Sequence, residues 1–161
     1  MKLPDQKDFY KSELDPDGKT AWNNFGGLTI AEAYEKFCER PYTYQEDFMF
    51  MGYAAFVFYF PIIDKYIREV EFLIAFSNDT YILSKGIEIR LEKKVRLPDH
   101  INNRIIDLYK FILDSCELPS VQKKSADLIE EDGGLQSFHH TLAKIKILCT
   151  SILEKVQELA K

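Results

Sequence analysis

The sequence predicts an all-α fold, a single-domain helical bundle of six to eight helices that ends in a long C-terminal helix. Apolar residues recur at steps of three and four along most of the 161 residues, as on the buried face of an amphipathic helix. Residues typical of helix starts come before several of these segments. No two segments alternate as a pair of partner strands would. A chain of this length fits one domain, so we assign residues 1–161 to a single unit.

The first twenty residues are predicted to form an irregular N-terminal arm. The stretch DPDGKT at 15–20 combines aspartate, proline and glycine, which are typical of turns. A calcium-binding EF-hand loop would need glycine at its sixth position and glutamate at its twelfth. Counted from Asp15, the glycine comes fourth and Gly26 takes the twelfth place, which argues against calcium.

The next two helix starts are predicted by the same device. Thr29 is a suitable N-cap, and Glu32 completes a capping box for a helix that ends before Pro41. Thr43 and Glu46 repeat this spacing and predict a second helix from there. Acidic residues in a first helical turn also bind free backbone amides and oppose the positive end of the helix dipole.

An aromatic run follows, with ten Phe or Tyr residues among residues 42–66. Its uncharged part, residues 48–63, has sixteen residues, whereas a membrane-spanning helix needs about twenty. Gly52 and Pro61 also interrupt it, so we predict no membrane span. Because proline suits a first helical turn but not a helix interior, Pro61 predicts a short helix, a break, and a second helix that reaches about Phe72.

The pattern of residues 81–94 fits either a helix or a strand. Leu83, Ile87 and Leu91 have helical spacing, but apolar and charged residues also alternate there as in a half-buried strand. A strand would need a partner, and no second strand is evident. We therefore expect a helix, although Gly86 weakens it by about 1 kcal/mol relative to alanine.

Three more helices are predicted in the last third of the chain. Pro98 and Asp99 open the first, which is expected to close at Pro119, and a short second helix covers residues 120–131. In the third, residues 135–160, apolar residues alternate steps of three and four for more than three heptads. This regularity predicts a long C-terminal helix of about 25 residues.

The apolar stripe of this last helix has two interpretations. Ile147, Leu148 and Leu153 widen it beyond a strict coiled-coil seam. A wide stripe favours packing inside the protein's own bundle, which is the interpretation we prefer. The alternative is a homodimer through residues 135–159.

Charge divides the chain into two unequal halves. The net charge is −5; residues 1–80 carry 8 basic and 14 acidic groups, and residues 81–161 carry 13 and 12. The acidic front half argues against nucleic acid as a partner, because phosphates need a basic face. It favours a protein partner with a basic surface. One basic run, interpreted as a solvated helix face, is the exception: Arg90, Lys93, Lys94 and Arg96.

The three cysteines, Cys38, Cys116 and Cys149, have no spacing typical of a disulfide framework or a zinc site. Each lies in an apolar helical pattern, where a reduced cysteine behaves as a small buried hydrophobe. The sequence also shows no signal-peptide pattern. Together these features favour a cytoplasmic location.

The sequence contains no motif typical of nucleotide binding, metal binding or nucleophilic catalysis. We therefore predict no catalytic residue, no cofactor and no metal site. Side chains of adjacent helical residues point about 100° apart, so His139 and His140 suit a structural or solvated role better than one metal site. The remaining catalytic option is acid–base chemistry at Glu46 and Asp47, which would need one carboxyl group buried beside a pocket with a raised pKa.

The aromatic run is interpreted as buried core, with a ligand pocket or a protein-binding surface as the alternatives. Tyrosine is common at binding surfaces because one end of its side chain is apolar and the other is polar. The candidate binding surface consists of Tyr42, Tyr44, Glu46, Asp47, Tyr53, Tyr59 and Asp64.

Two stretches, FGGLTIAEAYEKF at 25–37 and EDFMFMGYAAFVFYFPIIDKY at 46–66, resemble a group of small bacterial proteins of unknown function. That group carries a Phe-Gly turn and a later aromatic run that ends in proline. Phe58 and Phe60 depart from the group's pattern. The resemblance implies a soluble bacterial protein without a catalytic residue, in a class often suspected to include immunity and partner proteins.

Two functional hypotheses follow from these patterns. The first is a non-enzymatic protein-binding module, immunity- or adaptor-like, that engages its partner through the acidic front half. The alternative is a small-molecule-binding protein or an enzyme that uses the aromatic run together with Glu46 and Asp47. An enzymatic role is the less favoured of the two.

Overall fold

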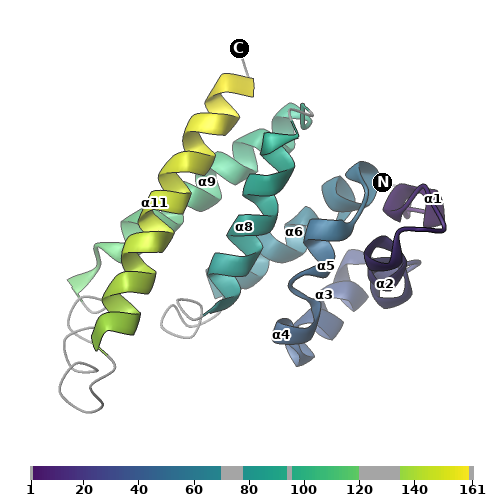
Figure 1. Ribbon diagram of the computed structural model, residues 1–161, viewed down its shortest axis with the longest axis horizontal. Helices are drawn as coiled ribbons and strands as arrows, with labels where there is room; N and C mark the ends of the chain where they lie inside the picture. Colours follow the sequence, from purple (N-terminus) through teal and green to yellow (C-terminus); the bar gives the residue numbers. More distant parts are fainter. Residues whose placement is uncertain (1, 70–77, 94–95, 120–134, 160–161) are drawn as a thin grey trace.

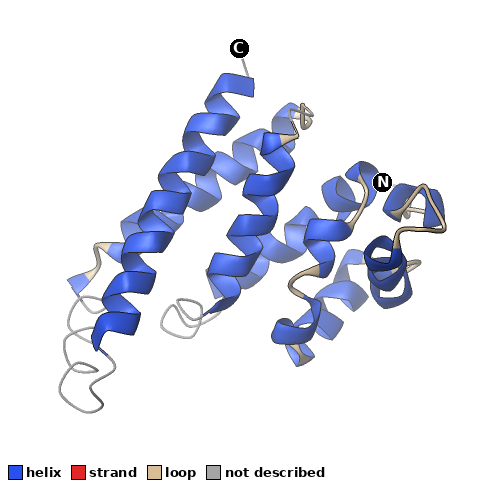
Figure 2. Ribbon diagram, in the orientation of Figure 1, coloured by secondary structure: helices blue, strands red, loops and turns tan. Residues whose placement is uncertain are grey.

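The computed structural model describes residues 2–69, 78–93, 96–119 and 135–159. All regular elements in these ranges are helices, so the predicted all-α bundle is confirmed (Figure 2). Six of these helices have ten residues or more, and three are single turns of four residues. The short helix predicted at 120–131 lies outside the described residues.

Three long helices lie side by side on one side of the molecule (Figure 1). They are α8 (Asn78–Glu92), α9 (Asp99–Cys116) and α11 (Leu135–Leu159), and α11 packs against both of the others. Next to them lies α6 (Tyr53–Glu69), which contacts α9, α1 and α3. The remaining helices form the opposite side: α1 (Gln6–Phe9), α2 (Pro16–Phe25), α3 (Ile30–Glu39), α4 (Pro41–Tyr44) and α5 (Asp47–Phe50).

The prediction of an irregular arm over residues 1–20 is wrong, because α1 and the first half of α2 lie there. Asp5 forms a capping box at the start of α1. Asp15 caps α2 by accepting the backbone N–H of Gly18 at 2.9 Å, and Pro16 takes the first helical position. Residues that are typical of a turn serve here as a helix start.

The first predicted capping box is confirmed at the start of α3. The backbone N–H of Thr29 donates to Oε2 of Glu32 at 2.8 Å, and the N–H of Glu32 donates to Oγ1 of Thr29 at 3.3 Å. The second predicted box is wrong: Thr43 lies inside α4, and Glu46 precedes α5 without a side-chain capping bond. Pro41 occupies the first position of α4, so a new helical turn begins before Thr43 is reached.

α6 is one helix of 17 residues, so the predicted break at Pro61 is wrong. Proline removes one backbone hydrogen bond from a helix interior, and burial of apolar side chains can offset that local cost. Ten residues of α6 are buried, so the packing around the helix holds it together through the proline. Within the described ranges, no helix is both long and apolar enough to span a bilayer.

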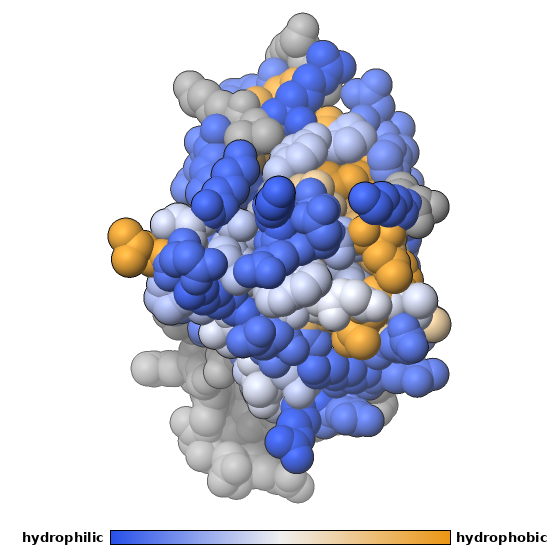
Figure 3. All heavy atoms as spheres, turned by 90° about the vertical axis from the view of Figure 1, so that its right-hand side faces the viewer, coloured by the Kyte–Doolittle hydropathy of each residue, from blue (hydrophilic) through white to orange (hydrophobic). Residues whose placement is uncertain are grey.

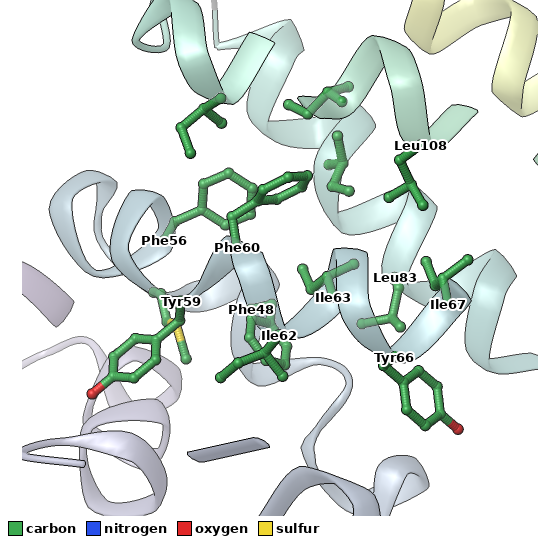
Figure 4. Packing of buried hydrophobic residues seen from close by; sticks show 14 of the residues in the cluster. Phe48, Phe56, Tyr59, Phe60, Ile62, Ile63, Tyr66, Ile67, Leu83 and Leu108 are labelled. Carbon is green, nitrogen blue, oxygen red and sulfur yellow. The ribbon is translucent and has the colours of Figure 1, made fainter. Parts of the chain in front are cut away.

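The aromatic run forms the centre of the hydrophobic core, as the first of its interpretations predicts. Figure 4 shows Phe56, Phe60 and Ile63 on the side of α6 that faces α8 and α9. Tyr59 and Ile62 point to the opposite side, toward the N-terminal helices. Because α6 packs on both sides, its apolar residues surround the helix and leave no simple stripe in the sequence.

The helical interpretation of residues 81–94 is confirmed by α8, although the helix begins earlier, at Asn78. Leu83, Ile87 and Leu91 are buried, as their helical spacing predicts. α9 begins directly after Pro98, also as predicted, and ends at Cys116.

α11 has the predicted length of 25 residues. The buried residues of its stripe are Leu142, Ile145, Leu148, Cys149, Ile152 and Val156. Ile147, which was expected to widen the stripe, is instead 71% exposed. The stripe is covered by α8 and α9 of the same chain, so a homodimer would need another face of α11.

Two of the three cysteines are buried as predicted. Burial raises the pKa of the Cys116 thiol to about 11 and that of the Cys149 thiol to about 12, so both stay protonated at neutral pH. Cys38 differs from the prediction, because its side chain is exposed on α3.

Candidate functional site

The structure divides the seven residues of the candidate binding surface between the core and the exterior. Tyr59 belongs to the core, with no exposed surface. Its hydroxyl group lies 2.7 Å from the carbonyl oxygen of Phe25 and 2.8 Å from that of Leu28. Burial, with a smaller contribution from the charge of Glu32, raises the pKa of this hydroxyl to about 12. Tyr59 thus fastens the connection between α2 and α3 to α6.

Asp64 is also buried, on the part of α6 that faces α9. Its Oδ1 accepts a hydrogen bond from Nε of Arg68 at 2.8 Å. Its Oδ2 accepts from Nε and Nη2 of Arg104 at 3.0 and 2.6 Å. Oδ2 of Asp64 therefore holds α6 to α9, while Oδ1 bonds within α6.

Glu46 and Asp47 point in different directions, although they are neighbours in sequence. Glu46 is exposed, whereas Asp47 is buried at the start of α5. Burial raises the pKa of the Asp47 carboxyl group to about 6, against the lowering effect of a 2.8 Å hydrogen bond from Nδ2 of Asn24 and of the Lys36 charge. A raised pKa suits acid–base chemistry, but Asp47 does not line the largest described pocket.

The three remaining tyrosines of the candidate set lie on two different elements. Tyr42 in α4 is 63% exposed, while Tyr44 is half-buried and packs edge-on against the ring of Phe25. Tyr53 opens α6, is 40% exposed, and donates its hydroxyl proton to the carbonyl oxygen of Arg96 at 2.9 Å. The exposed members of the set thus lie in two separate regions of the surface, one around Tyr42 and one around Tyr53.

The first region, which we call the acidic edge, comprises three exposed glutamates and one exposed tyrosine on α3, on α4 and directly before α5. It consists of Glu35, Glu39, Tyr42 and Glu46. Glu35 and Glu39 are four residues apart in α3, so they share one face of that helix. None of the three glutamates forms an ion pair with any residue in the described ranges.

Nearby basic residues leave much of this negative charge uncompensated. Lys36 turns inward, where its Nζ donates to the carbonyl oxygen of Asn24 at 2.6 Å and lies 5.3 Å from the ring centroid of Tyr44. Arg40 is exposed at the end of α3 and offsets one of the three negative charges. The adjoining end of the molecule, which carries α1 and α2, is mainly hydrophilic with smaller hydrophobic areas between (Figure 3).

Some carboxylates on the opposite side of the molecule are engaged in contacts between helices. Glu88 accepts hydrogen bonds from Nζ of Lys85 at 2.5 Å, Oγ of Ser151 at 2.8 Å and Nζ of Lys155 at 2.9 Å. Burial alone would raise its pKa, but these donors outweigh it and hold the pKa at about 2. Glu88 thereby ties α8 to α11.

The second region contains a residue whose role the sequence analysis missed. Arg90 was interpreted as part of a solvated basic face, but only 8% of its surface is exposed. Its Nη2 donates to the carbonyl oxygens of Phe48, Met49 and Met51 at 3.0, 3.2 and 2.5 Å. Its Cζ lies 4.2 Å from the ring centroid of Phe56. Burial lowers the pKa of the guanidinium group to about 10, which leaves it protonated at neutral pH.

Arg90 lines a pocket of about 730 Å³, which we call the Arg90 pocket. Its walls come from α1 and the residues after it, from the connection between α5 and α6, and from the end of α8. Gly52 brings the first two walls together by donating its N–H to the carbonyl oxygen of Phe9 at 2.7 Å. A Cβ atom on Gly52 would lie 2.1 Å from the carbonyl oxygen of Asp8, so only glycine fits there. In the sequence alone, Gly52 is visible only as an interruption of the aromatic run.

No metal site emerges from the part of the chain that the structure describes: no group of three or more His, Cys, Asp or Glu side chains is placed to hold an ion there. The prediction for His139 and His140 concerns side chains outside those described.

Comparison of the sequence with models of protein families gives no match, and comparisons with curated proteins and with solved structures give none either. The resemblance of residues 25–66 to small bacterial proteins therefore remains an interpretation of the sequence.

Proposed function

We propose that the protein is a non-enzymatic binding module that engages a protein partner with a basic surface. The acidic edge supports this proposal, because it presents three exposed carboxylates without ion pairs in the described ranges beside Tyr42. Negative charge on one surface speeds its encounter with a basic partner and disfavours acidic competitors. Tyr42, 63% exposed, offers an aromatic anchor, and interface centres are rich in tyrosine.

The distribution of charge supports α3 and α4 as the location of this interface. On the other side of the molecule, Glu88, Glu92 and Glu117 are each bound by a lysine, whereas Asp107, Asp114, Glu154 and Glu158 are exposed without ion pairs in the described ranges. Basic residues balance these acids, because residues 81–161 carry 13 basic and 12 acidic groups, against 8 and 14 in residues 1–80. We therefore expect the field of the protein to be more negative on the side of the acidic edge.

The alternative, catalysis by Glu46 and Asp47, has less support from the geometry. General acid–base chemistry needs a carboxyl group within reach of a bound substrate. Asp47 is buried and bonds Asn24, whereas Glu46 is exposed. The two carboxyl groups share no described pocket that would hold a substrate.

The proposed role is immunity- or adaptor-like and is placed in the bacterial cytoplasm. The resemblance of residues 25–66 is the support for the role and for the bacterial source. A reducing compartment also suits Cys38, whose exposed thiol would be open to oxidation elsewhere.

The test compares two variants that change the net charge by the same amount. The first reverses the edge with Glu35→Lys, Glu39→Lys and Glu46→Lys. The control reverses three exposed acids of α9 and α11 with Asp107→Lys, Glu154→Lys and Glu158→Lys. Each immobilised protein is incubated with an extract of the native cells at low and at high salt, and the retained proteins are identified and quantified.

We expect a basic protein that the wild type and the control variant retain at low salt and that the edge variant loses. High salt should release it, since the screening length falls from about 10 Å at 0.1 M to about 3 Å at 1 M. Equal retention by the edge variant, retention that salt does not weaken, or the absence of any retained basic protein would each contradict the proposal.

A further inference from the structure

We propose that the Arg90 pocket binds a small organic anion with a carboxylate or phosphate head and a flat apolar body. This site lies apart from the acidic edge and does not depend on the proposed protein partner. It rests on four features of the pocket: its buried cation, the surrounding lysines, the engaged acids and the half-exposed aromatic rings.

The cation of Arg90 has no counter-ion in the described ranges. The three carbonyl groups that accept from Nη2 lie at the C-terminal end of α5, where carbonyl groups lack helical partners. They contribute dipoles but no full negative charge. Buried charges in proteins are ordinarily paired with an opposite charge, and here that place is open to a ligand.

Two of the three guanidinium nitrogens of Arg90 have no acceptor among the described residues. Nε is buried and unpaired. Nη1 makes no hydrogen bond either, because all three bonds of this side chain start from Nη2. Nη1 carries two N–H groups that can donate to an oxygen of a carboxylate or phosphate, and hydrogen bonds between charged partners are stronger than neutral ones. The three carbonyl bonds from Nη2 hold the guanidinium group in place before any ligand arrives.

The other charged side chains of the pocket add to its positive charge. Lys7, Lys11 and Lys93 line it and are exposed, without ion pairs to described residues. Asp8 and Asp15 also line it, but both carboxylates cap helices: Asp8 accepts from the N–H of Asp5 and Asp15 from that of Gly18, each at 2.9 Å. Four basic and two acidic side chains give the wall a net charge of +2.

The volume of the pocket and the aromatic residues that line it indicate that the ligand has an apolar part. The pocket volume of about 730 Å³ falls within the range of about 300–1,000 Å³ that is usual for small-molecule sites. Phe50 and Tyr53 line it and are 39% and 40% exposed. Half-exposed aromatic rings can pack against a flat apolar group of a ligand. A bare inorganic ion has no such group.

A purely structural role for Arg90 is the rival explanation. Such a role accounts for the bonds from Nη2 and for the contact with the ring of Phe56. A structural role does not explain why Nε has no hydrogen-bond partner or why three lysines line the pocket. The experiment therefore has to observe Arg90 itself and not only the stability of the protein.

The direct test follows the side-chain Nε–H resonance of Arg90 by NMR in the full-length protein, assigned through its disappearance in Arg90→Lys. The probes are 1-naphthyl phosphate, 1-naphthoate, neutral 1-naphthamide and inorganic phosphate. We expect both naphthyl anions to shift this resonance with saturation, and naphthamide to leave it unchanged. The stronger of the two anions identifies the head group, and inorganic phosphate should bind more weakly than 1-naphthyl phosphate.

A second measurement does not require Arg90 to be replaced. In Lys11→Gln/Lys93→Gln, the affinity for the better anion should fall about tenfold, because two charges near the head are lost. The matched control, Lys110→Gln/Lys144→Gln, removes two exposed lysines from α9 and α11 and should bind like the wild type. The proposal is overturned if neither anion shifts the Arg90 resonance, if naphthamide shifts it equally, or if the pocket variant keeps wild-type affinity.

Discussion

The hydroxyl oxygen of Tyr59 lies 2.7 Å from the carbonyl oxygen of Phe25, and so joins the middle of α6 to the end of α2. The same hydroxyl lies 2.8 Å from the carbonyl oxygen of Leu28. One O–H group thus serves two buried carbonyl groups at the turn where the chain leaves α2 and enters α3. A residue that looked like a candidate for binding is therefore part of the framework.

Tyr59→Phe keeps the ring and removes this donor: the carbonyl oxygen of Leu28 loses the hydroxyl group, and that of Phe25 keeps only the backbone N–H of Leu28 at 3.1 Å. We expect the free energy of unfolding, measured by urea denaturation, to fall by about 1–3 kcal/mol. Tyr53→Phe is the matched control, because its hydroxyl bonds a single carbonyl oxygen on the exterior. It should change stability by less than about 0.5 kcal/mol. Equal effects of the two substitutions would contradict the role assigned to Tyr59.

Asp47→Asn should stabilise the protein at neutral pH. Burial raises the pKa of Asp47 from 3.8 to about 6 in the folded state, so folding favours the protonated form. The stabilisation from this protonation is complete below pH 4 and is lost as the pH rises through 6. Asparagine stays neutral and can still accept from Asn24. The variant should therefore exceed the wild type by up to about 3 kcal/mol at pH 7 and match it near pH 4.

Denaturation at several pH values measures this difference. Glu39→Gln removes an exposed carboxylate of α3 and serves as the control, which should follow the wild type across the same range. An Asp47→Asn variant whose advantage does not grow between pH 4 and pH 7 would contradict a raised pKa of Asp47 in the folded protein.

Replacing glycine by alanine should have opposite effects on the free energy of unfolding at positions 52 and 86. In Gly52→Ala, the new Cβ atom would lie 2.1 Å from the carbonyl oxygen of Asp8, and the walls of the Arg90 pocket would have to separate. We expect a loss of about 1–3 kcal/mol in unfolding free energy. In Gly86→Ala, the Cβ atom would meet Met49 at an ordinary 3.5 Å. Because alanine favours a helix over glycine, this variant should gain up to about 1 kcal/mol.

Substitutions on α11 can distinguish the face that packs in the bundle from the face that is exposed to solvent. Ile145 is 1% exposed and Ile147 is 71% exposed. Ile145→Asp buries a charge and should cost more than about 4 kcal/mol, whereas Ile147→Asp should be nearly neutral. Sedimentation of wild type and Ile147→Asp tests the remaining homodimer alternative. A dimer that this substitution dissociates would place the dimer interface on the outer face of α11.

The elements that could be predicted from the sequence are those decided by local chemistry. Thr29 and Glu32 sit at the spacing of a capping box and form one, because the helix pattern of residues 30–39 begins directly after Thr29. The stripe of α11 repeats often enough to predict its length and most of its buried face, with Ile147 as the exception. Local spacing alone is not sufficient, since Thr43 and Glu46 have the spacing of a capping box and form none.

The wrong predictions concern residues whose structure depends on contacts with parts of the chain that are distant in sequence. Pro61 is accepted inside α6 because α1, α3 and α9 pack around that helix, which no local rule describes. Asp15 and Pro16 suit a turn and a helix start equally well. For Arg90 a signal was present: it follows Ile87 by three residues and Leu83 by seven, so it lies on the buried side of α8. Its long side chain and charge led to the opposite interpretation.

Through Glu88 and Arg90, α8 connects the C-terminal helix α11 to the segment around α5. Glu88 is held by Ser151 and Lys155 near the C-terminus, and Arg90 by the carbonyl groups after Phe48. A version truncated before residue 135 would leave Glu88 without Lys155 and remove the helix that packs against both α8 and α9. We therefore expect limited proteolysis that cuts off α11 to destabilise the rest of the protein.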